Sequence, residues 1–210
     1  MNWFNKIRKY RWTLIGRREI KKIIEDKRKN HKPIKVILGA GHHSRTSGEW
    51  INTDLPQFDI TNESHWKYLF GNVKIDNLFA EHVFEHLTIE QNEIALKFAQ
   101  MYLNANGTIR IAIPDKNNQD VSYQNGTKIN GSDIGADDHK LFFNIDDYTK
   151  LIKKTKFEIK PLEYFDSNNQ FQIISYTDND GYVIRSKKNN FHYSPIPNYT
   201  SLIFDLKFIK

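Results

Sequence analysis

The chain has 210 residues, of which 39% are hydrophobic and 13% aromatic, and its formal net charge is +6. This length fits one globular domain with a short additional segment, and the absence of cysteine excludes disulfides, cysteine-ligated zinc and a cysteine nucleophile. No apolar run is long enough for a membrane span and the N-terminus lacks the pattern of a signal peptide, so we expect a cytoplasmic protein.

Residues 1–34 are a basic segment that precedes the domain, which we place at residues 35–210. Residues 1–35 contain 13 Lys/Arg and 3 Asp/Glu, a balance of +10, so the other 175 residues carry −4. Apolar residues recur at helical spacing on both sides of Gly16, which predicts two amphipathic helices. We expect these helices to pack on the domain or to cover its site. The alternatives are peripheral contact of residues 1–30 with an anionic membrane at its inner face, or contact with a partner or nucleic acid.

From Lys35 onward, short apolar runs alternate with helical patterns. This alternation predicts an α/β fold with a mostly parallel sheet and helices on both faces, in which ligands bind at the carboxyl ends of the strands. The expected elements are strands at 36–38 and 50–53, a short strand at 58–60, a helix at 64–70, a strand at 76–80, a helix at 88–103, a turn at 106–107 and a strand at 108–113.

The second half of the domain begins with a long segment rich in Asn, Asp and Gly, between Asp115 and Asp138. A loop of this length in a compact domain is usually functional or disordered, and we interpret it as an acceptor-site loop. The late strands lie close together in the sequence, which predicts an antiparallel edge. The expected elements are a helix at 146–155, a strand at 157–165, a hairpin of 171–176 with 181–186, and a last strand at 201–208.

The first strand runs into a glycine loop with Gly39 and Gly41, and Asp54 follows the second strand. Glycine lets the backbone turn tightly and approach a ligand, and an acidic residue at this place can accept hydrogen bonds from a ribose. Ser44 stands where the dinucleotide fingerprint has its third glycine, which disfavours NAD and FAD. The pattern therefore indicates a nucleoside-containing cofactor, and a plain β-turn is the alternative.

A second motif, at residues 81–87, contains His82-x-x-Glu85-His86, which matches a zinc-hydrolase pattern. A hydrolase would have this motif inside a helix and would need a distant third ligand. Here the motif directly follows a strand, and no further pattern singles out a third ligand, so we predict no metal. The remaining interpretations are a polar cap at a helix start, or a cofactor-site role for Glu81 and His82.

Taken in order, these segments resemble class I S-adenosylmethionine-dependent methyltransferases, and most of all a small bacterial branch associated with surface-polysaccharide synthesis. The resemblance covers residues 35–165 well and the rest more weakly. It implies a Rossmann-like fold with a seven-stranded sheet and S-adenosyl-L-methionine as the cofactor. The segments that carry it are Leu-Gly-Ala-Gly, Trp-Ile-Asn-Thr-Asp, Asp-Ile-Thr, Phe-Ala-Glu-His-Val-Phe-Glu-His-Leu and Gly-Thr-Ile-Arg-Ile-Ala-Ile-Pro-Asp.

The resemblance implies roles for particular positions. The glycine loop would approach the methionine and ribose, Asp54 would bind the ribose hydroxyls, Asp59 the adenine amino group, and Glu81 the region of the reacting methyl. The first strand lacks the acidic residue that many of these enzymes carry before the glycine loop. The implied cofactor-binding residues are Leu38, Gly39, Ala40, Gly41, Asp54, Leu55, Asp59, Ile60, Glu81 and His82.

The implied activity is methyl transfer to a sugar hydroxyl of a glycan or glycolipid. A hydroxyl acceptor benefits from a general base; the candidates are His82, Asp115 and His139, and we expect His139 first and Asp115 second. Aromatic residues such as Tyr123 would suit a polyhydroxylated acceptor. The alternatives are a nucleic-acid or small-molecule methyltransferase, or a non-catalytic module that keeps the fold. The acidic body of the chain argues against nucleic acid as a partner.

Overall fold

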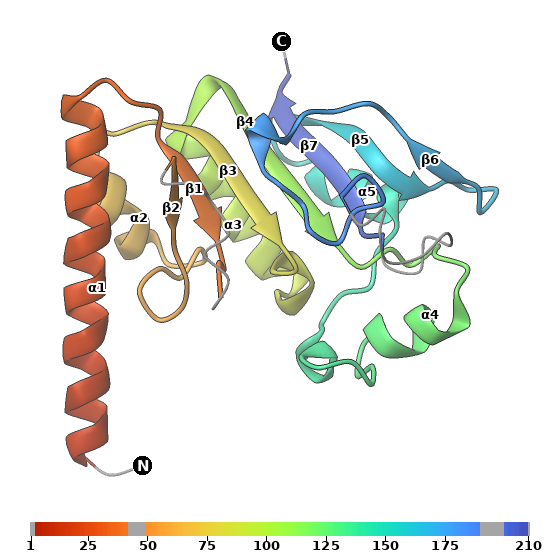
Figure 1. Cartoon of the computed structure of the whole chain (residues 1–210), viewed down its shortest axis with the longest axis horizontal. Helices are drawn as coiled ribbons and strands as arrows, with labels where there is room; N and C mark the ends of the chain where they lie inside the picture. The colour runs from red at the N-terminus through yellow and green to blue at the C-terminus, as the bar shows by residue number, and fades with distance from the viewer. Residues whose placement is uncertain (1–2, 42–48, 190–199, 210) are drawn as a thin grey trace.

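The computed structural model describes residues 3–41, 49–189 and 200–209, with side chains from Thr13 onward. The segment after Gly41 that contains His42, His43 and Ser44 lies outside the described residues. Figure 1 shows a central sheet with helices packed around it. The elements are α1 Trp3–Lys29, β1 Lys35–Leu38, β2 Trp50–Asn52, α2 Glu63–Phe70, β3 Ile75–Glu81, η1 Phe84–His86, α3 Ile89–Tyr102, β4 Leu103–Ile113, α4 Val121–Thr127, η2 Ala136–Asp138, α5 Ile145–Ile152, β5 Phe157–Phe165, β6 Phe171–Ile173, η3 Asp178–Asp180 and β7 Leu202–Phe208.

The seven strands form one mixed sheet in the order β2-β1-β3-β4-β7-β5-β6. β1 pairs in parallel with β2 and β3, and β3 pairs in parallel with β4. β7 is antiparallel to both β4 and β5, and β6 is antiparallel to β5. Five strands therefore run in one direction, while β7 and β6 run against them. The expected Rossmann-like, mostly parallel sheet with an antiparallel C-terminal edge is confirmed.

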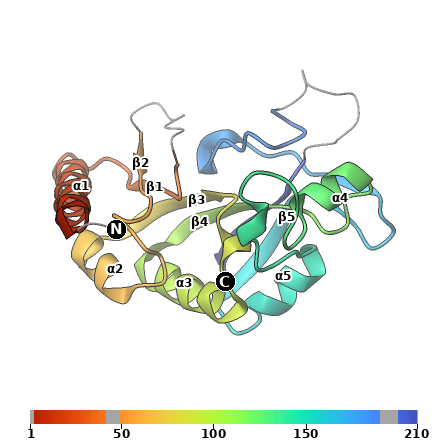
Figure 2. The same ribbon diagram turned by 90° about the horizontal axis from the view of Figure 1, so that it is seen from below.

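One face of the sheet is covered by α2, α3 and α5 (Figure 2). The side chains between them and the sheet form a large apolar core that includes Ile24 of α1, Leu78 of β3 and Leu96 of α3. Trp66 of α2 is fully buried at the centre of an aromatic group with Phe58, Phe70, Phe98 and Tyr102. Burial of this much apolar surface is the main source of stability on this face.

The opposite face is covered by residues 174–189, which we call the strap (Figure 2). The strap contains η3, which contacts β3 and β4. The apolar cluster on this face is small: Ile37, Phe79, Ala112, Leu162, Val183 and Ile203. Gly181 has a φ of +135° and lies directly against Phe79. A Cβ at this position would come within 2.6 Å of the Phe79 ring, so only glycine fits.

Two buried charged side chains hold the strap on the sheet. Arg110 of β4 forms a bidentate pair with Asp205 of β7, at 2.8 and 3.0 Å, and its Nη1 donates to the carbonyls of Thr177 and Gly181 in the strap. Glu163 of β5 accepts hydrogen bonds from the Tyr176 hydroxyl, the Thr200 hydroxyl, and the backbone N–H groups of Lys187 and Lys188. The strap is therefore attached mainly by directional polar contacts.

The N-terminal segment forms one continuous helix, α1, where we expected two helices interrupted at Gly16. One glycine inside a helix costs only about 1 kcal/mol, and here it gives room for Gln57, whose Cγ would lie 2.9 Å from a Cβ at position 16. The next residue, Arg17, donates from Nε to the carbonyl of Gln57 at 2.7 Å. α1 packs on α2 and β2 at the edge of the sheet (Figure 1). None of the described helices is long and apolar enough to cross a bilayer.

Four other local expectations are wrong. Residues 58–60 form a turn because Asp59 accepts hydrogen bonds from the Thr61 N–H and hydroxyl. Residues 106–107 lie inside β4, next to a register shift opposite Ile75 and Asn77. The segment 115–138 is not a plain loop, because it contains α4 and η2, whereas its assignment to the acceptor site stays a prediction. Residues 181–186 form no strand, because the N–H groups of Ile184 and Arg185 donate to the Glu81 carboxylate instead of to a neighbouring strand.

Candidate functional site

The ends of the parallel strands bring the predicted site residues to one edge of the sheet. The glycine loop follows β1, Asp54 follows β2, Glu81 ends β3, and Asp115 follows β4. Because neighbouring parallel strands end at the same edge, segments far apart in the sequence meet there.

The glycine loop and Asp54 are tied together. The Gly41 N–H donates to Asp54 Oδ2 at 2.8 Å, and the Leu55 N–H donates to Oδ1 at 2.7 Å. Gly39 and Gly41 have φ values of +63° and +59°, a region that favours glycine. At Gly39 a Cβ would also lie 2.5 Å from Val83 Cγ2. Each carboxylate oxygen keeps a second lone pair, so Asp54 can accept further hydrogen bonds from a ligand.

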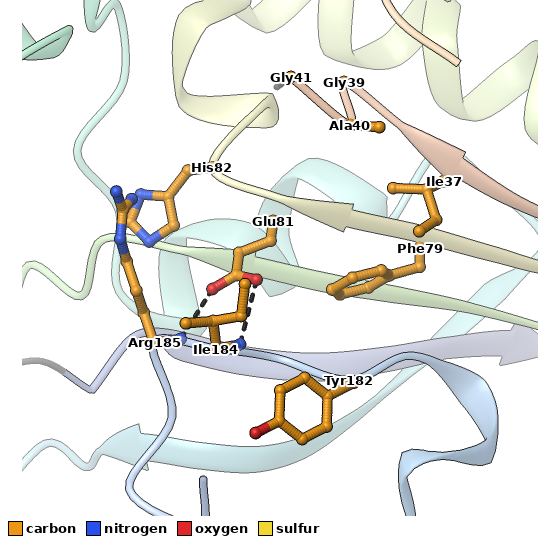
Figure 3. A pocket seen from close by; sticks show the side chains of 10 residues that line it. All are labelled: Ile37, Gly39, Ala40, Gly41, Phe79, Glu81, His82, Tyr182, Ile184 and Arg185. Atoms are coloured by element: carbon orange, nitrogen blue, oxygen red, sulfur yellow. Dashed lines mark hydrogen bonds between the residues drawn. The ribbon is translucent and has the colours of Figure 1, made fainter. Parts of the chain in front are cut away.

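Beside this loop lies a cavity of about 290 Å³, which we call the glycine-loop pocket (Figure 3). Its walls come from the first and third strand ends and from the strap. The lining residues are Ile37, Gly39, Ala40, Gly41, Phe79, Glu81, His82, Tyr182, Ile184 and Arg185. The pocket thus brings together five of the expected cofactor-binding residues: Gly39, Ala40, Gly41, Glu81 and His82.

Glu81 connects the pocket to the strap. Its Oε2 accepts the Ile184 N–H at 3.1 Å and its Oε1 accepts the Arg185 N–H at 2.7 Å, as the dashed lines in Figure 3 show. The carboxylate therefore fixes the position of the strap wall. A ligand in the pocket would meet a Glu81 whose orientation is already set by two backbone donors.

The other expected cofactor-binding residues lie outside the lining of this pocket. Leu38 and Ile60 are buried in the core on the helix-covered face. Leu55 is exposed, and Asp59 is occupied by hydrogen bonds within its own turn. Asp54 is also outside the lining, but it holds Gly41, which is part of it.

A second cavity, of about 470 Å³, adjoins the motif at residues 82–86, and we call it the histidine pocket. It shares His82 and Arg185 with the glycine-loop pocket. The lining residues are His82, His86, Thr127, Asp133, Ile134, Gly135, Ala136, His139 and Arg185. Part of the long segment 115–138 therefore forms a wall of this pocket.

His82 lies between the two pockets in a left-handed backbone conformation, with a φ of +56°. Its Nε2 is 3.1 Å from the Ser201 hydroxyl, and its Nδ1 is 2.9 Å from Glu85 Oε1. A left-handed conformation is uncommon for residues other than glycine. Both ring nitrogens of His82 have partners, so neither is free to accept a proton from a substrate. The geometry therefore fits a positioning role better than the role of general base.

His139 is buried at the floor of the histidine pocket. Its Nδ1 lies 2.7 Å from the Thr127 carbonyl oxygen. A carbonyl cannot donate, so Nδ1 carries the proton and neutral His139 has its lone pair on Nε2. That Nε2 is 4.0 Å from Glu85 Oε1. Of the three candidate bases, His139 therefore has a suitable lone pair in a pocket.

Glu85 is a buried carboxylate beside three histidines. The residue is 2% exposed, and Nδ1 of His82 lies 2.9 Å from its Oε1 as the nearest cationic partner. Burial raises the pKa of Glu85, but the charge and hydrogen bond of His82, a backbone hydrogen bond and the smaller effect of His86 together more than offset it, so the pKa is lowered.

Asp115 is fully buried and lines neither pocket. Its Oδ2 accepts the Phe165 N–H and its Oδ1 the Asn117 N–H, while its own N–H donates to the Tyr123 hydroxyl. Burial raises the pKa of Asp115 to about 6, although the two backbone hydrogen bonds oppose this. The position does not fit the expected base, and the buried Tyr123 does not fit an acceptor contact.

Sequence reasoning missed the strap residues Tyr182, Ile184 and Arg185, because their apolar run resembles a strand. It also missed that His139 lies next to His86, with ring centroids 4.8 Å apart. The zinc-like motif was a signal for Glu85 and His86, but nothing in the spacing connected it to His139.

No protein-family model matches the chain, and no curated protein matches it. Among solved structures, an S-adenosylmethionine-dependent methyltransferase from Clostridium acetobutylicum ATCC 824 aligns over 100% of both chains, with 13% identity and a TM-score of 0.51. The chain has the class I methyltransferase fold. A methyltransferase from Thermotoga maritima, described as a possible histamine N-methyltransferase, aligns over 97% of this chain and 96% of its own, with 13% identity and a TM-score of 0.46.

The protein LepI, solved in complex with SAM, also resembles the chain. The alignment covers 85% of this chain and 43% of LepI, with 9% identity and a TM-score of 0.49. This chain therefore spans less than half the length of LepI.

Proposed function

We propose that this protein is an S-adenosyl-L-methionine-dependent methyltransferase that methylates a hydroxyl group of a sugar in a glycan or glycolipid. The observation that carries the proposal is the pair of adjoining pockets, which share His82 and Arg185. Methyl transfer needs this arrangement, because the donor and acceptor must approach each other in line from two sides.

The glycine-loop pocket would hold the cofactor. Its position at the carboxyl ends of β1 and β3 is where α/β folds of this kind bind nucleoside ligands. Asp54 follows β2 beside the same loop and would accept hydrogen bonds from the ribose hydroxyls. Glu81 and His82 lie toward the histidine pocket, so the reactive methyl would be placed near them.

The histidine pocket would hold the acceptor. In the reaction, the acceptor oxygen forms a bond to the methyl carbon while the carbon–sulfur bond breaks and its electron pair goes to sulfur. The hydroxyl proton must leave, and Nε2 of His139 has a lone pair that can accept it. Positioning supplies much of the acceleration, because a sulfonium is a good leaving group.

The choice of a sugar as the acceptor rests on the resemblance and on the character of the pocket. Thr127, Asp133 and the histidines place polar groups around it, which suits several hydroxyls. α1 carries most of the excess positive charge, and we propose that it brings the enzyme to an anionic inner membrane face where glycolipid acceptors lie. The side chains of residues 3–12 at its start lie outside the described residues.

Titration with S-adenosylhomocysteine tests the cofactor assignment. We expect the wild type to bind it and Asp54→Ala to bind it about 10–100-fold more weakly, as for the loss of charge-assisted hydrogen bonds. Asp146→Ala is the matched control, because this exposed carboxylate on α5 is outside both pockets. A wild-type protein that does not bind S-adenosylhomocysteine would contradict the proposal.

A second experiment tests the acceptor class. Labelled S-adenosylmethionine is incubated with a panel of glycosides, glycolipid extracts, and RNA. We expect label in the sugar compounds and not in RNA, and much less label with His139→Gln. Label transferred only to RNA would replace the sugar acceptor with a nucleic acid.

A further inference from the structure

We infer that Glu85, His86 and His139 form a binding site for a divalent transition-metal ion. One ligand atom from each side chain lies within 4.8 Å of the other two, and all three sit at the floor of the histidine pocket or directly below it. Two imidazoles and one carboxylate are a common ligand set of catalytic metal ions. The inference that a metal binds here does not depend on the proposed function. The role of the metal in catalysis does rest on the proposed function.

The carboxylate of Glu85 is an independent indication of a ligand. It is almost completely buried, and apart from the short contact of Oε1 with His82 its oxygens have no well-aligned hydrogen bond from the described chain. Buried carboxylates are normally hydrogen-bonded, paired with a cation or bound to a metal. His82 Nδ1, 2.9 Å from Oε1, is the partner on one side of the carboxylate. A metal ion on the side of His86 and His139 would give the carboxylate a second cationic partner.

His139 is oriented as metal-binding histidines usually are. Metal-binding histidines commonly donate their second ring N–H to a carbonyl or carboxylate, which fixes the ring. His139 makes this contact with the Thr127 carbonyl, so its Nε2 is the free ligand atom. Nδ1 of His86 lies 3.7 Å from Asp138 Oδ2, which is beyond hydrogen-bond distance, so the ring of His86 is not fixed in this way.

The ligand set also indicates the class of metal. Imidazole favours Zn²⁺, Fe²⁺ and related ions, whereas Mg²⁺ and Ca²⁺ prefer oxygen ligands alone. Ligand atoms of a tetrahedral Zn²⁺ site lie about 3.4 Å apart, since each is about 2.1 Å from the metal. The three side chains must therefore move closer by about 1 Å on binding. His86, with 31% of its side chain exposed, is the ligand with the most room to do so.

A metal here would act on the acceptor. Glu85, His86 and His139 would hold the metal and could leave a position for the acceptor oxygen, where coordination would lower the pKa of the hydroxyl. The hydroxyl would lose its proton to solvent water, its oxygen would bond to the methyl carbon, and the electrons of the broken carbon–sulfur bond would go to sulfur. In the metal-bound protein His139 would be a ligand, so its proposed role as the base applies to the metal-free protein. With a metal in this site, the expected acceptors are those sugars whose reacting hydroxyl can coordinate the metal.

The test measures metal binding on the full chain after removal of metals with a chelator. We expect calorimetry to show one equivalent of Zn²⁺, with weaker Mn²⁺ and much weaker Mg²⁺ binding. We expect His86→Gln and Glu85→Gln to weaken Zn²⁺ binding by more than about 100-fold, because loss of a direct ligand should cost more than the roughly 10–100-fold known for loss of an outer-shell partner. Co²⁺ bound to the wild type should give a visible absorption band that both variants lose.

His31→Gln and Glu90→Gln are the matched controls, because both residues are exposed and lie outside the cluster. Circular dichroism and S-adenosylhomocysteine titration on every variant show that the fold and the cofactor site remain. Zn²⁺ binding that is absent, or that is unchanged in His86→Gln, would overturn the inference. Absent S-adenosylhomocysteine binding with intact Zn²⁺ binding would instead overturn the proposed function.

Discussion

The two faces of the sheet are covered in different ways. On one face, α2, α3 and α5 bury a large apolar core around Trp66. On the other, Val183 of the strap packs against five apolar side chains of the sheet, and the strap is held by Arg110 and Glu163, which are buried charges. Apolar packing is non-directional and tolerates small shifts, whereas hydrogen bonds to buried charges fix the position of a backbone segment.

The glycine-loop pocket lies on the face that the strap covers. The strap supplies Tyr182, Ile184 and Arg185 to its wall, and Glu81 bonds the strap at the same place. The helix-covered face therefore mainly carries stability, and the strap-covered face mainly carries the shape of the pocket. Substitutions on the two faces should separate these properties.

The largest expected effect is on the helix-covered face. Trp66→Ala should lower the free energy of unfolding by about 3–5 kcal/mol, because it leaves a cavity in the aromatic group and removes the hydrogen bond to the Ile60 carbonyl. Urea denaturation measures this. Trp50→Ala is the matched control, since Trp50 is half-buried beside Phe79 on the strap-covered face, and it should cost clearly less. Equal losses would contradict the difference between the faces.

The next effect is at the buried ion pair. Arg110→Met should cost about 3 kcal/mol, because it leaves Asp205 buried without its partner. The double variant Arg110→Met/Asp205→Leu should recover much of this loss, although the strap carbonyls of Thr177 and Gly181 still lose a donor. Denaturation of both variants gives the comparison. A double variant no more stable than the single one would mean that the charge of Asp205 is not the cause.

The smallest effect on stability, and the most local one, is at Glu81. Glu81→Gln keeps the size of the side chain but leaves one acceptor for two N–H donors, so we expect a loss of about 1 kcal/mol. Faster hydrogen exchange at Ile184 and Arg185 and several-fold weaker S-adenosylhomocysteine binding should accompany it. Glu158→Gln, an exposed change on β5, is the control. Unchanged exchange at both amides would show that Glu81 does not hold the strap.

Local patterns allowed the glycine loop, Asp54 and the parallel strands to be predicted. Their signals are short in sequence: glycine spacing, apolar runs and an acidic residue at a strand end. The sheet order places Gly41 beside Asp54 without further information.

The rest depends on contacts between distant segments. The run Tyr182-Val183-Ile184 has the composition of a strand, but the side chain of Glu81 takes the N–H of Ile184 that a neighbouring strand would otherwise use. Likewise, His139 meets Glu85 because the Lys140 and Leu141 N–H groups donate to the Glu85 carbonyl, a contact that spacing does not predict. Gly16 was expected to interrupt the helix, but it lies inside α1 and gives room for Gln57. This contact joins distant parts of the sequence, so local patterns do not reveal it.

The close packing of Gly39 against Val83 joins the two pockets mechanically. Gly39 belongs to the loop that lines one pocket, and Val83 lies between His82 and Glu85 beside the other. A ligand that shifted the loop would therefore also press on the corner with the histidines. Thermodynamic linkage makes such an effect reciprocal: the factor by which the first ligand changes the affinity for the second equals the factor by which the second changes the affinity for the first. Occupancy of one pocket would thus be sensed in the other through a contact that only glycine permits.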